Sequence, residues 1–195
     1  LAVLLLLIAL FGSFLAPYDP LKVNYDFSLQ SPSFLHVFGT DKLGRDVFSR
    51  ILCGAKTSFG LTFLMLFLIV FIGMIVGLIA GLSNDKVESF FNNIINGLLA
   101  FPDTIFAIAV VGIVGAGLFN TVFALALIWW TKYARLTLAL VKQEKKKNYL
   151  VISKMSGVPP LQRVIRYLLP NILSQILVTA FLDIGNMMIS LAGLS

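Results

Sequence analysis

Two carboxylates stand inside otherwise apolar stretches of this sequence, where they could act on a charged solute within a membrane. They are Asp103, which follows Pro102, and Asp183. A charge in hydrocarbon is costly unless it is paired or hydrated, so such residues are candidates for a translocation pathway. A carboxylate also suits a cation. We assign Asp183, Asp103 and the neighbouring Met187 to this candidate pathway. The alternative for Asp183 is a buried hydrogen bond to a neighbouring helix. The alternatives for Asp103 are hydrogen bonds to backbone groups freed at the Pro102 kink and a position near the membrane interface.

Other chemistries are excluded by residue counts. The chain has one cysteine, Cys53, and one histidine, His36, so it contains neither an internal disulfide nor a His/Cys metal or catalytic cluster. It contains no P-loop pattern, so it cannot hydrolyse ATP itself. We therefore expect no catalytic residue, no confident metal site and no cofactor bound by this chain. Cys53 is expected to be a small apolar packing residue. His36 is expected to be a solvated loop residue, and contact with a transported solute is the alternative.

The candidate residues must be positioned by membrane-spanning helices. Of the 195 residues 58% are hydrophobic and only 12% are charged, which predicts an integral membrane protein. The apolar runs are continuous rather than alternating, which favours an all-α polytopic helical bundle over a barrel. Residues 1–195 are read as one transmembrane domain, a fragment at both ends, with five spans. The spans are Leu1–Ala16 (truncated), Phe59–Ile79, Ile94–Phe119 (kinked at Pro102), Asn120–Thr131 and Leu168–Leu194.

Basic residues indicate the orientation of these spans. Nine of the 15 Lys and Arg residues lie between Lys132 and Arg166, so the 132–167 segment is predicted to be cytoplasmic. Alternation then places the 17–57 loop outside the membrane. Within that loop, Arg45–Lys56 has apolar residues at helical spacing and predicts an amphipathic helix lying along the interface.

The cytoplasmic segment contains a helix–turn–helix pattern at residues 149–171. Asn148–Ser156 predicts a short helix that ends at Gly157, and Pro159-Pro160 prevents its continuation. Residues 161–169 then follow amphipathic helical spacing and lead into the last span. One interpretation is a basic surface resting on anionic lipid head groups. The other is a docking element for a soluble partner, since a lipid-binding loop does not need a rigid turn.

Two longer patterns resemble those of a known transporter family. The first resembles the cytoplasmic loop of ABC importer permeases, in which Y-V-E-A-A-x-x-x-G is followed by H-x-L-P-N. The residues that carry this resemblance are Tyr133-Ala134-Arg135, Tyr149, Gly157 and Leu169-Pro170-Asn171. Residues 38–50 resemble the external signature F-G-T-D-x-x-G-R-D-x-x-S-R of the second permease subunit of dipeptide, oligopeptide and nickel importers. Its candidate residues are Gly39, Thr40, Asp41, Gly44, Arg45, Asp46 and Arg50. The resemblance covers essentially the whole chain, and it implies that one further span follows.

The resemblance implies that the 149–157 helix couples the permease to an ATPase. The coupling residues are Tyr149, Val151, Ile152, Ser153, Gly157, Pro170 and Asn171. The chain departs from the family pattern at Val151, where the motif has glutamate, and at Tyr167, where it has histidine. Because the family glutamate forms part of the ATPase contact, the details of coupling are expected to differ here.

The implied protein is a multi-pass permease subunit of the bacterial or archaeal cytoplasmic membrane. Its expected partners are a second permease subunit, two ABC ATPase subunits that use ATP, an extracytoplasmic solute-binding protein and membrane lipids, but no nucleic acid. Leu182-Asp183-Ile184-Gly185 and Lys154-Met155-Ser156-Gly157 are closer to nickel-import permeases than to the peptide branch. Nickel, free or chelated, is therefore the expected cargo, and dipeptides or oligopeptides are the alternative. A secondary transporter or channel subunit is the rival from another class.

Overall fold

The structure, a computed structural model, describes residues 11–194. The chain divides into two compact units, Leu1–Leu61 and Thr62–Ser195, and each is described by itself. The expected first span, Leu1–Ala16, lies mostly outside the described residues. Of its described part, residues 11–15 are helical. Within the described part, the only strand-like pairing is an isolated bridge between Thr40 and Asp46. The all-α class predicted from the sequence is confirmed.

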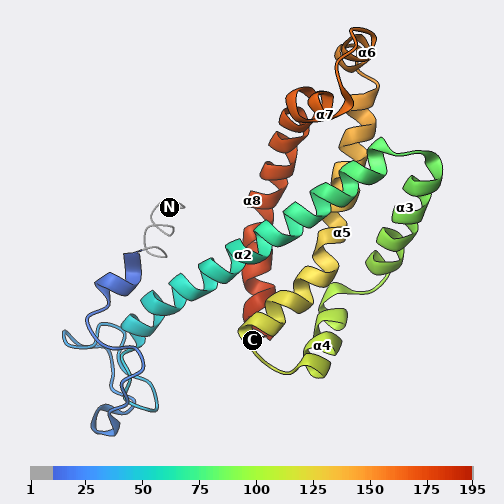
Figure 1. The fold of residues 1–195 in the computed structure, drawn as a ribbon. Coiled ribbons are helices and arrows are strands. Elements are labelled where there is room, and N and C mark those ends of the chain that lie inside the picture. Colours follow the sequence, from blue (N-terminus) through green and yellow to red (C-terminus); the bar gives the residue numbers. More distant parts are fainter. Residues whose placement is uncertain (1–10, 195) are drawn as a thin grey trace. The chain divides into compact units, whose positions relative to one another are not determined.

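The helices are long and follow one another closely along the chain (Figure 1). In order they are η1 (Tyr25–Phe27), α2 (Val47–Leu82), α3 (Asp85–Leu99), α4 (Asp103–Val114), α5 (Leu118–Lys145), α6 (Asn148–Met155), α7 (Pro160–Arg163), the π-helical turn η2 (Val164–Leu168) and α8 (Leu169–Leu194). Among the described residues, Val47–Leu82, Leu118–Lys145 and Pro160–Leu194 are long and apolar enough to cross a membrane, and α3 with α4 makes a fourth candidate if the bent pair is one span.

Helix α2 is continuous where two separate helices were predicted. The expected interfacial helix Arg45–Lys56 and the expected span Phe59–Ile79 are parts of one helix from Val47 to Leu82. No proline interrupts this stretch. The hydroxyl of Thr57, at the expected junction, donates to the carbonyl of Cys53 one turn earlier at 3.5 Å, so this polar side chain is accommodated within the helix. The prediction of a separate interfacial helix was therefore wrong.

The expected span Ile94–Phe119 is not a kinked helix but two helices. Helix α3 ends at Leu99, α4 begins at Asp103, and their axes differ by 83°. Proline has no backbone N–H and disfavours the helical conformation of the preceding residue, which explains a break at Pro102. Asp103 is the first residue of α4, and its carboxylate accepts a hydrogen bond from the backbone N–H of Thr104 at 2.8 Å, one of the N–H groups that a helix start leaves without a backbone partner.

Helix α5 is the centre of the second unit and is longer than the predicted span Asn120–Thr131. It continues through the basic run to Lys145, because lysine, glutamine, glutamate and leucine are all good helix formers. Helix α3 packs antiparallel to its second half through Glu88, which accepts from Lys142, and Asn96, which accepts from Arg135. Much of the segment expected to be a cytoplasmic loop is thus helix.

Helix α2 approaches α5 through three glycines spaced four residues apart, Gly73, Gly77 and Gly81. A Cβ atom added at these positions would lie between 2.5 and 2.7 Å from the nearest atoms of α5. Such contact requires residues without side chains, which is the usual way in which membrane helices come close together. The backbone of α2 therefore lies directly against the helix that carries Lys132 and Tyr133.

The predicted helix–turn–helix after α5 is present. Helix α6 ends at Met155, and Gly157 follows with a φ of +74°, the left-handed conformation that favours glycine at a helix end. Pro160 is the first residue of α7, which passes through the π-helical turn into α8 just before Pro170. The short helix is thus linked by a tight turn to a helical stretch, Pro160–Leu194, that is long and apolar enough to cross a membrane.

Candidate functional site

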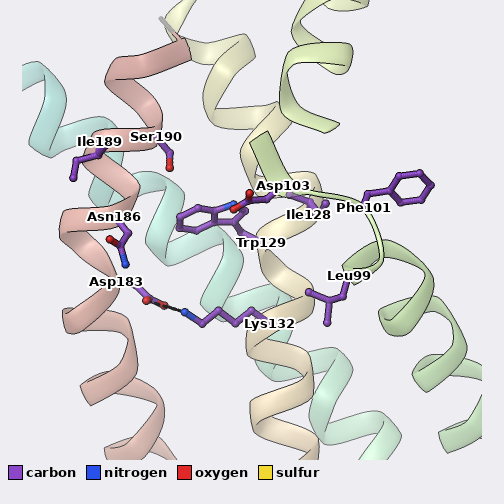
Figure 2. Close-up of a pocket in the computed structure, with 10 residues that line it drawn as sticks. All are labelled: Leu99, Phe101, Asp103, Ile128, Trp129, Lys132, Asp183, Asn186, Ile189 and Ser190. Carbon is purple, nitrogen blue, oxygen red and sulfur yellow. Dashed lines mark hydrogen bonds and ion pairs between the residues drawn. The ribbon is translucent and has the colours of Figure 1, made fainter. Parts of the chain in front are cut away.

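A polar cluster joins α5 to α8 inside the apolar part of the second unit (Figure 2). The ammonium of Lys132 donates to both carboxylate oxygens of Asp183, at 2.8 and 2.6 Å. The phenol of Tyr133, which is fully buried, donates to the second oxygen at 2.8 Å. The hydrogen bond expected from Asp183 to a neighbouring helix is therefore present, with three donated hydrogens rather than one.

The two charges of this cluster differ in their exposure. The side chain of Asp183 is 9% exposed, whereas that of Lys132 is 50% exposed. Burying a carboxylate is tolerable when it is paired and its lone pairs are satisfied, which Lys132 and Tyr133 accomplish. Because Lys132 is half exposed, it can swing away from Asp183 without leaving a buried cation behind. Asp183 would then be open to another cation.

The cluster opens into a cavity of about 410 Å³ between α5, α8 and the α3–α4 break. Asp183 and Asp103 both line it, so two of the three residues assigned to the candidate pathway come together, whereas Met187 is fully buried away from it. The other lining residues are Leu99, Phe101, Ile128, Trp129, Lys132, Asn186, Ile189 and Ser190. The walls are apolar, with a few oxygen and nitrogen atoms, as in many small-molecule sites.

The described residues hold no group of three or more His, Cys, Asp or Glu side chains that could bind a metal ion. A metal ion entering the cavity would therefore meet two carboxylates at most and would keep water or a chelator as its remaining ligands.

In the first unit, the external motif forms a compact polar loop around Asp41. Its carboxylate accepts from Nε of Arg45 at 2.8 Å and from Arg50, and also from the backbone N–H groups of Leu43 and Arg45. The hydrogen bond from the Arg45 side chain, together with these other donors, holds the pKa of Asp41 well below its usual range. Gly44 has a φ of +69°, and a Cβ there would overlap the carbonyl oxygen of Asn24. The motif residues thus stabilise a loop fold.

The remaining motif residues complete the same loop. The hydroxyl of Thr40 donates to the carbonyl of Phe27, and Gly39 also has a positive φ, +72°. Asp46 accepts from the backbone N–H of Ser49 at 2.7 Å and bonds His36 Nδ1 at 2.9 Å. Desolvation would raise the pKa of Asp46, but its hydrogen bonds to Ser49 and His36 outweigh desolvation and lower it.

The prediction that His36 is merely solvated was wrong. Its side chain is 13% exposed, is paired with Asp46 and lies 4.9 Å from the ring of Tyr18.

The segment predicted to couple to an ATPase, residues 149–171, is held by a hydrogen-bond network around Glu144 at the end of α5. The carboxylate of Glu144 accepts from Lys147 at 2.6 Å and from the phenol of Tyr149. Asn171, at the start of α8, donates to the same phenol at 3.3 Å and to the carbonyl of Tyr167 at 2.6 Å. Burial and the neighbouring Glu144 carboxylate raise the pKa of Tyr149 to about 12, so its hydroxyl keeps its proton at neutral pH. Two of the predicted coupling residues, Tyr149 and Asn171, therefore meet.

Val151, where the family motif has glutamate, lies on the exposed surface of α6, whereas Tyr167, where the motif has histidine, lies in η2. Val151 and Ile152 are 47% and 60% exposed, and Met155 beside them is 83% exposed. Ser153 is instead buried and bonds the carbonyl of Leu150 at 2.8 Å. Pro170 is exposed at the start of α8. Helix α6 therefore presents an apolar surface where the family pattern has a glutamate.

Sequence reasoning missed several residues that the structure brings to these sites. Lys132 and Tyr133 were not connected with Asp183, because the pairs are 51 and 50 residues apart in the chain. Glu144 is the only acidic residue between positions 132 and 167, and that isolation within a basic run was a signal. The four-residue spacing of Gly73, Gly77 and Gly81 was a second signal, typical of closely packed membrane helices.

Comparison with known proteins places the chain in a family. Residues 73–195 match the family described as "Binding-protein-dependent transport system inner membrane component". A nickel transport system permease protein of Escherichia coli (strain K12) is 35% identical over 192 residues, which cover 98% of this chain and 69% of that relative. A di/tripeptide transport system permease protein of Pseudomonas aeruginosa (strain UCBPP-PA14) is 36% identical over 197 residues, covering 98% of this chain and 65% of the relative.

A glutathione transport system permease protein of Shigella flexneri serotype 5b (strain 8401) is 36% identical over 194 residues, covering 99% of this chain and 64% of that protein. The chain thus spans less than two thirds of the length of the peptide and glutathione relatives. The family match covers more than half of the chain, and the resemblance extends over nearly all of it. The chain therefore belongs to the binding-protein-dependent transport system inner membrane components, the permease family of ABC importers.

Proposed function

We propose that this chain forms part of the translocation pathway of an ABC importer that moves nickel, free or chelated, across the cytoplasmic membrane. The observation that carries the proposal is the Asp183–Lys132–Tyr133 cluster at the edge of the cavity between α5 and α8. A cation that reached Asp183 would take the place of Lys132, whose half-exposed side chain can move aside. Asp103 adds a second carboxylate to the same cavity.

A chelated or hydrated metal fits this cavity better than a bare ion. The described lining has two carboxylates, the Asn186 amide and the Ser190 hydroxyl, but neither histidine nor cysteine. Nickel prefers nitrogen-rich coordination, so the chelator would supply most of the ligands and the cavity would recognise the charge of the complex.

The second candidate cargo is a short peptide, favoured by one specific observation. The cavity offers a cation, Lys132, and an anion, Asp183, side by side. A zwitterionic peptide could exchange with this pair, its amino group taking Asp183 and its carboxylate taking Lys132, without leaving either charge unpaired.

We further propose that α6 is the element that contacts an ATPase subunit, with a second permease subunit and a solute-binding protein completing the importer. The Tyr149–Glu144–Asn171 network supports this role, because it ties α6 to the ends of both α5 and α8. A force applied to α6 would then reach the two helices that hold Lys132 and Asp183. The exposed Val151, Ile152 and Met155 would be the docking surface, so the matching groove is expected to be apolar where a family glutamate would need a polar partner.

Uptake measurements test the cargo. In the complete transporter, Asp183→Asn should lower the uptake of labelled nickel, with or without an added chelator. The control is Ser174→Ala, which changes an exposed residue of the same helix that does not line the cavity and should leave uptake unchanged. A loss of labelled dipeptide uptake with nickel uptake unchanged would instead establish the peptide alternative. Unchanged uptake of both, at normal expression, would rule out a role for Asp183 in translocation.

Gly157→Val tests the coupling role. A β-branched residue is strained at a φ of +74°, so the turn after α6 must change. We expect ATP hydrolysis to become independent of transport while membrane insertion is retained. Wild-type coupling in this variant would contradict the proposal. Failure of an ATPase subunit to co-purify with the wild-type chain would favour a secondary transporter or channel instead.

A further inference from the structure

A second cavity, of about 550 Å³, lies at the end of the second unit that carries most of the basic residues. It is bounded by the ends of α2 and α5 and by the α6–α7 segment; Figure 1 shows α6 beyond the end of α5 and α7 at the start of α8. Its lining combines three cationic side chains, Lys145, Lys154 and Arg163, with apolar ones that include Leu82 and Val164. It shares no residue with the cavity at Asp183.

The cations of this cavity lack counter-charges within the described part of the chain. No acidic side chain is among the described lining residues, and none of the three cations forms an ion pair with another described residue. The ammonium of Lys145 donates to the carbonyl of Gly81 at 2.9 Å, which leaves its charge uncompensated. The Nε atom of Arg163 is buried and has no hydrogen-bond acceptor. A buried, unbonded guanidinium N–H is costly, so an anionic acceptor is expected there.

The nearest candidate acceptor in sequence is already engaged. Glu144 precedes Lys145, but its two carboxylate oxygens accept from Lys147 and Tyr149. The anion must therefore come from outside the described residues.

We propose that this cavity binds the phosphate group of an anionic phospholipid. A guanidinium and two ammonium groups match the charge and the acceptor geometry of a phosphodiester. The apolar residues suit the start of an acyl chain, which a free phosphate ion or an acidic protein segment would not use. The cavity also lies at the ends of α2 and α5, two helices long and apolar enough to cross a membrane, and basic pockets between helices on the cytoplasmic side of a membrane suit anionic lipids. The lipid would link α6 to the ends of α2 and α5.

Lipid retention by the purified transporter tests this proposal. The complex would be incubated with phosphatidylglycerol or with phosphatidylcholine, and the lipid that stays bound would be measured by native mass spectrometry. In Lys154→Gln/Arg163→Gln we expect phosphatidylglycerol affinity to fall by roughly five-fold for each cation removed, or about 25-fold in all. Phosphatidylcholine binding should be weak in every variant.

A matched control removes the same charge elsewhere. Lys146 and Arg166 are exposed, flank the same segment and do not line the cavity, so Lys146→Gln/Arg166→Gln should retain phosphatidylglycerol as the wild type does. Equal loss in the two double variants would overturn the proposal, because only general charge would then matter. Displacement of the lipid by inorganic phosphate would also overturn it in favour of a free-anion site. Unchanged lipid retention with loss of the ATPase subunit would overturn it in favour of a protein contact.

Discussion

The contact between α2 and α5 gives the sharpest quantitative prediction. At Gly73 an added Cβ would lie 2.6 Å from the carbonyl oxygen of Trp130 and 2.6 Å from Cβ of Tyr133. At Gly77 it would lie 2.6 Å from the carbonyl oxygen of Ala134. Backbone atoms cannot rotate away, so alanine at either position must push the helices apart. At Gly81 the nearest atoms belong to the side chain of Val141, which can adjust in part.

The magnitudes follow from two opposing effects. Alanine favours a helix over glycine by up to about 1 kcal/mol. Forcing one extra methyl group into a packed contact costs about 1–3 kcal/mol. With the full helix gain subtracted, we expect Gly73→Ala and Gly77→Ala to lower the free energy of unfolding by up to about 2 kcal/mol, and Gly81→Ala to have an effect near zero. Gly97→Ala is the control: a Cβ there has no neighbour within 4 Å, so it should be neutral or slightly stabilising.

Unfolding of the purified variants by increasing denaturing detergent, followed by circular dichroism, measures this order. Gly73→Ala should in addition lower cargo uptake, because it presses on the residue that donates to Asp183. Equal unfolding of Gly73→Ala and Gly97→Ala would refute the close approach of α2 to α5. Normal uptake in a destabilised Gly73→Ala would refute only the connection from α2 to the Asp183 cluster.

Three further predictions concern single interactions. Lys132→Met should destabilise the protein by about 3 kcal/mol because it leaves the Asp183 carboxylate buried without a counter-charge. Adding Asp183→Asn should restore most of the lost stability. A double variant no more stable than Lys132→Met would contradict the pairing. Tyr149→Phe should lower the free energy of unfolding by about 1.5–3 kcal/mol, because it removes the hydrogen bond to Glu144, and it should weaken ATPase coupling. Tyr25→Phe, at an exposed position of η1, is the control, and identical unfolding of the two variants would contradict the network. Because the pKa of Asp41 is lowered in the folded loop at residues 38–50, the ionised carboxylate stabilises this loop at pH values above the ordinary aspartate pKa of 3.8, and this stability should be lost as the pH falls below that value. Asp41→Asn should weaken the pH dependence of proteolysis in this loop. An unaltered pH dependence would contradict the prediction.

Local features of the sequence were sufficient for much of the fold. Apolar runs predict spanning helices, because backbone groups in hydrocarbon must bond within their own segment. Gly157 and Pro159-Pro160 predicted the end of α6, because left-handed backbone and a missing N–H are local properties. Helix boundaries were harder to predict. The amphipathic start of α2 and its apolar remainder have the same helical period, so periodicity alone could not reveal one continuous helix.

The candidate sites show the same division. Asp183 could be singled out because a lone carboxylate in an apolar run is conspicuous. The 149–157 helix and the 38–50 motif could each be recognised by their residue patterns. The partners could not be found in this way. Lys132 reaches Asp183 across 51 residues, and Asn171 reaches Tyr149 across 22, so their meeting depends on how α5, α6 and α8 pack.

The sequence by itself determined a helical membrane protein with a basic, turn-containing segment on one side, because hydrophobicity, charge distribution and backbone restrictions act residue by residue. Only the tertiary structure decided that α3 and α4 form a bent pair, that three glycines bring α2 against α5, and that Asp183 is held by a lysine and a tyrosine. These features arise from close packing and from the need to satisfy buried polar groups, which depend on residues distant in the chain.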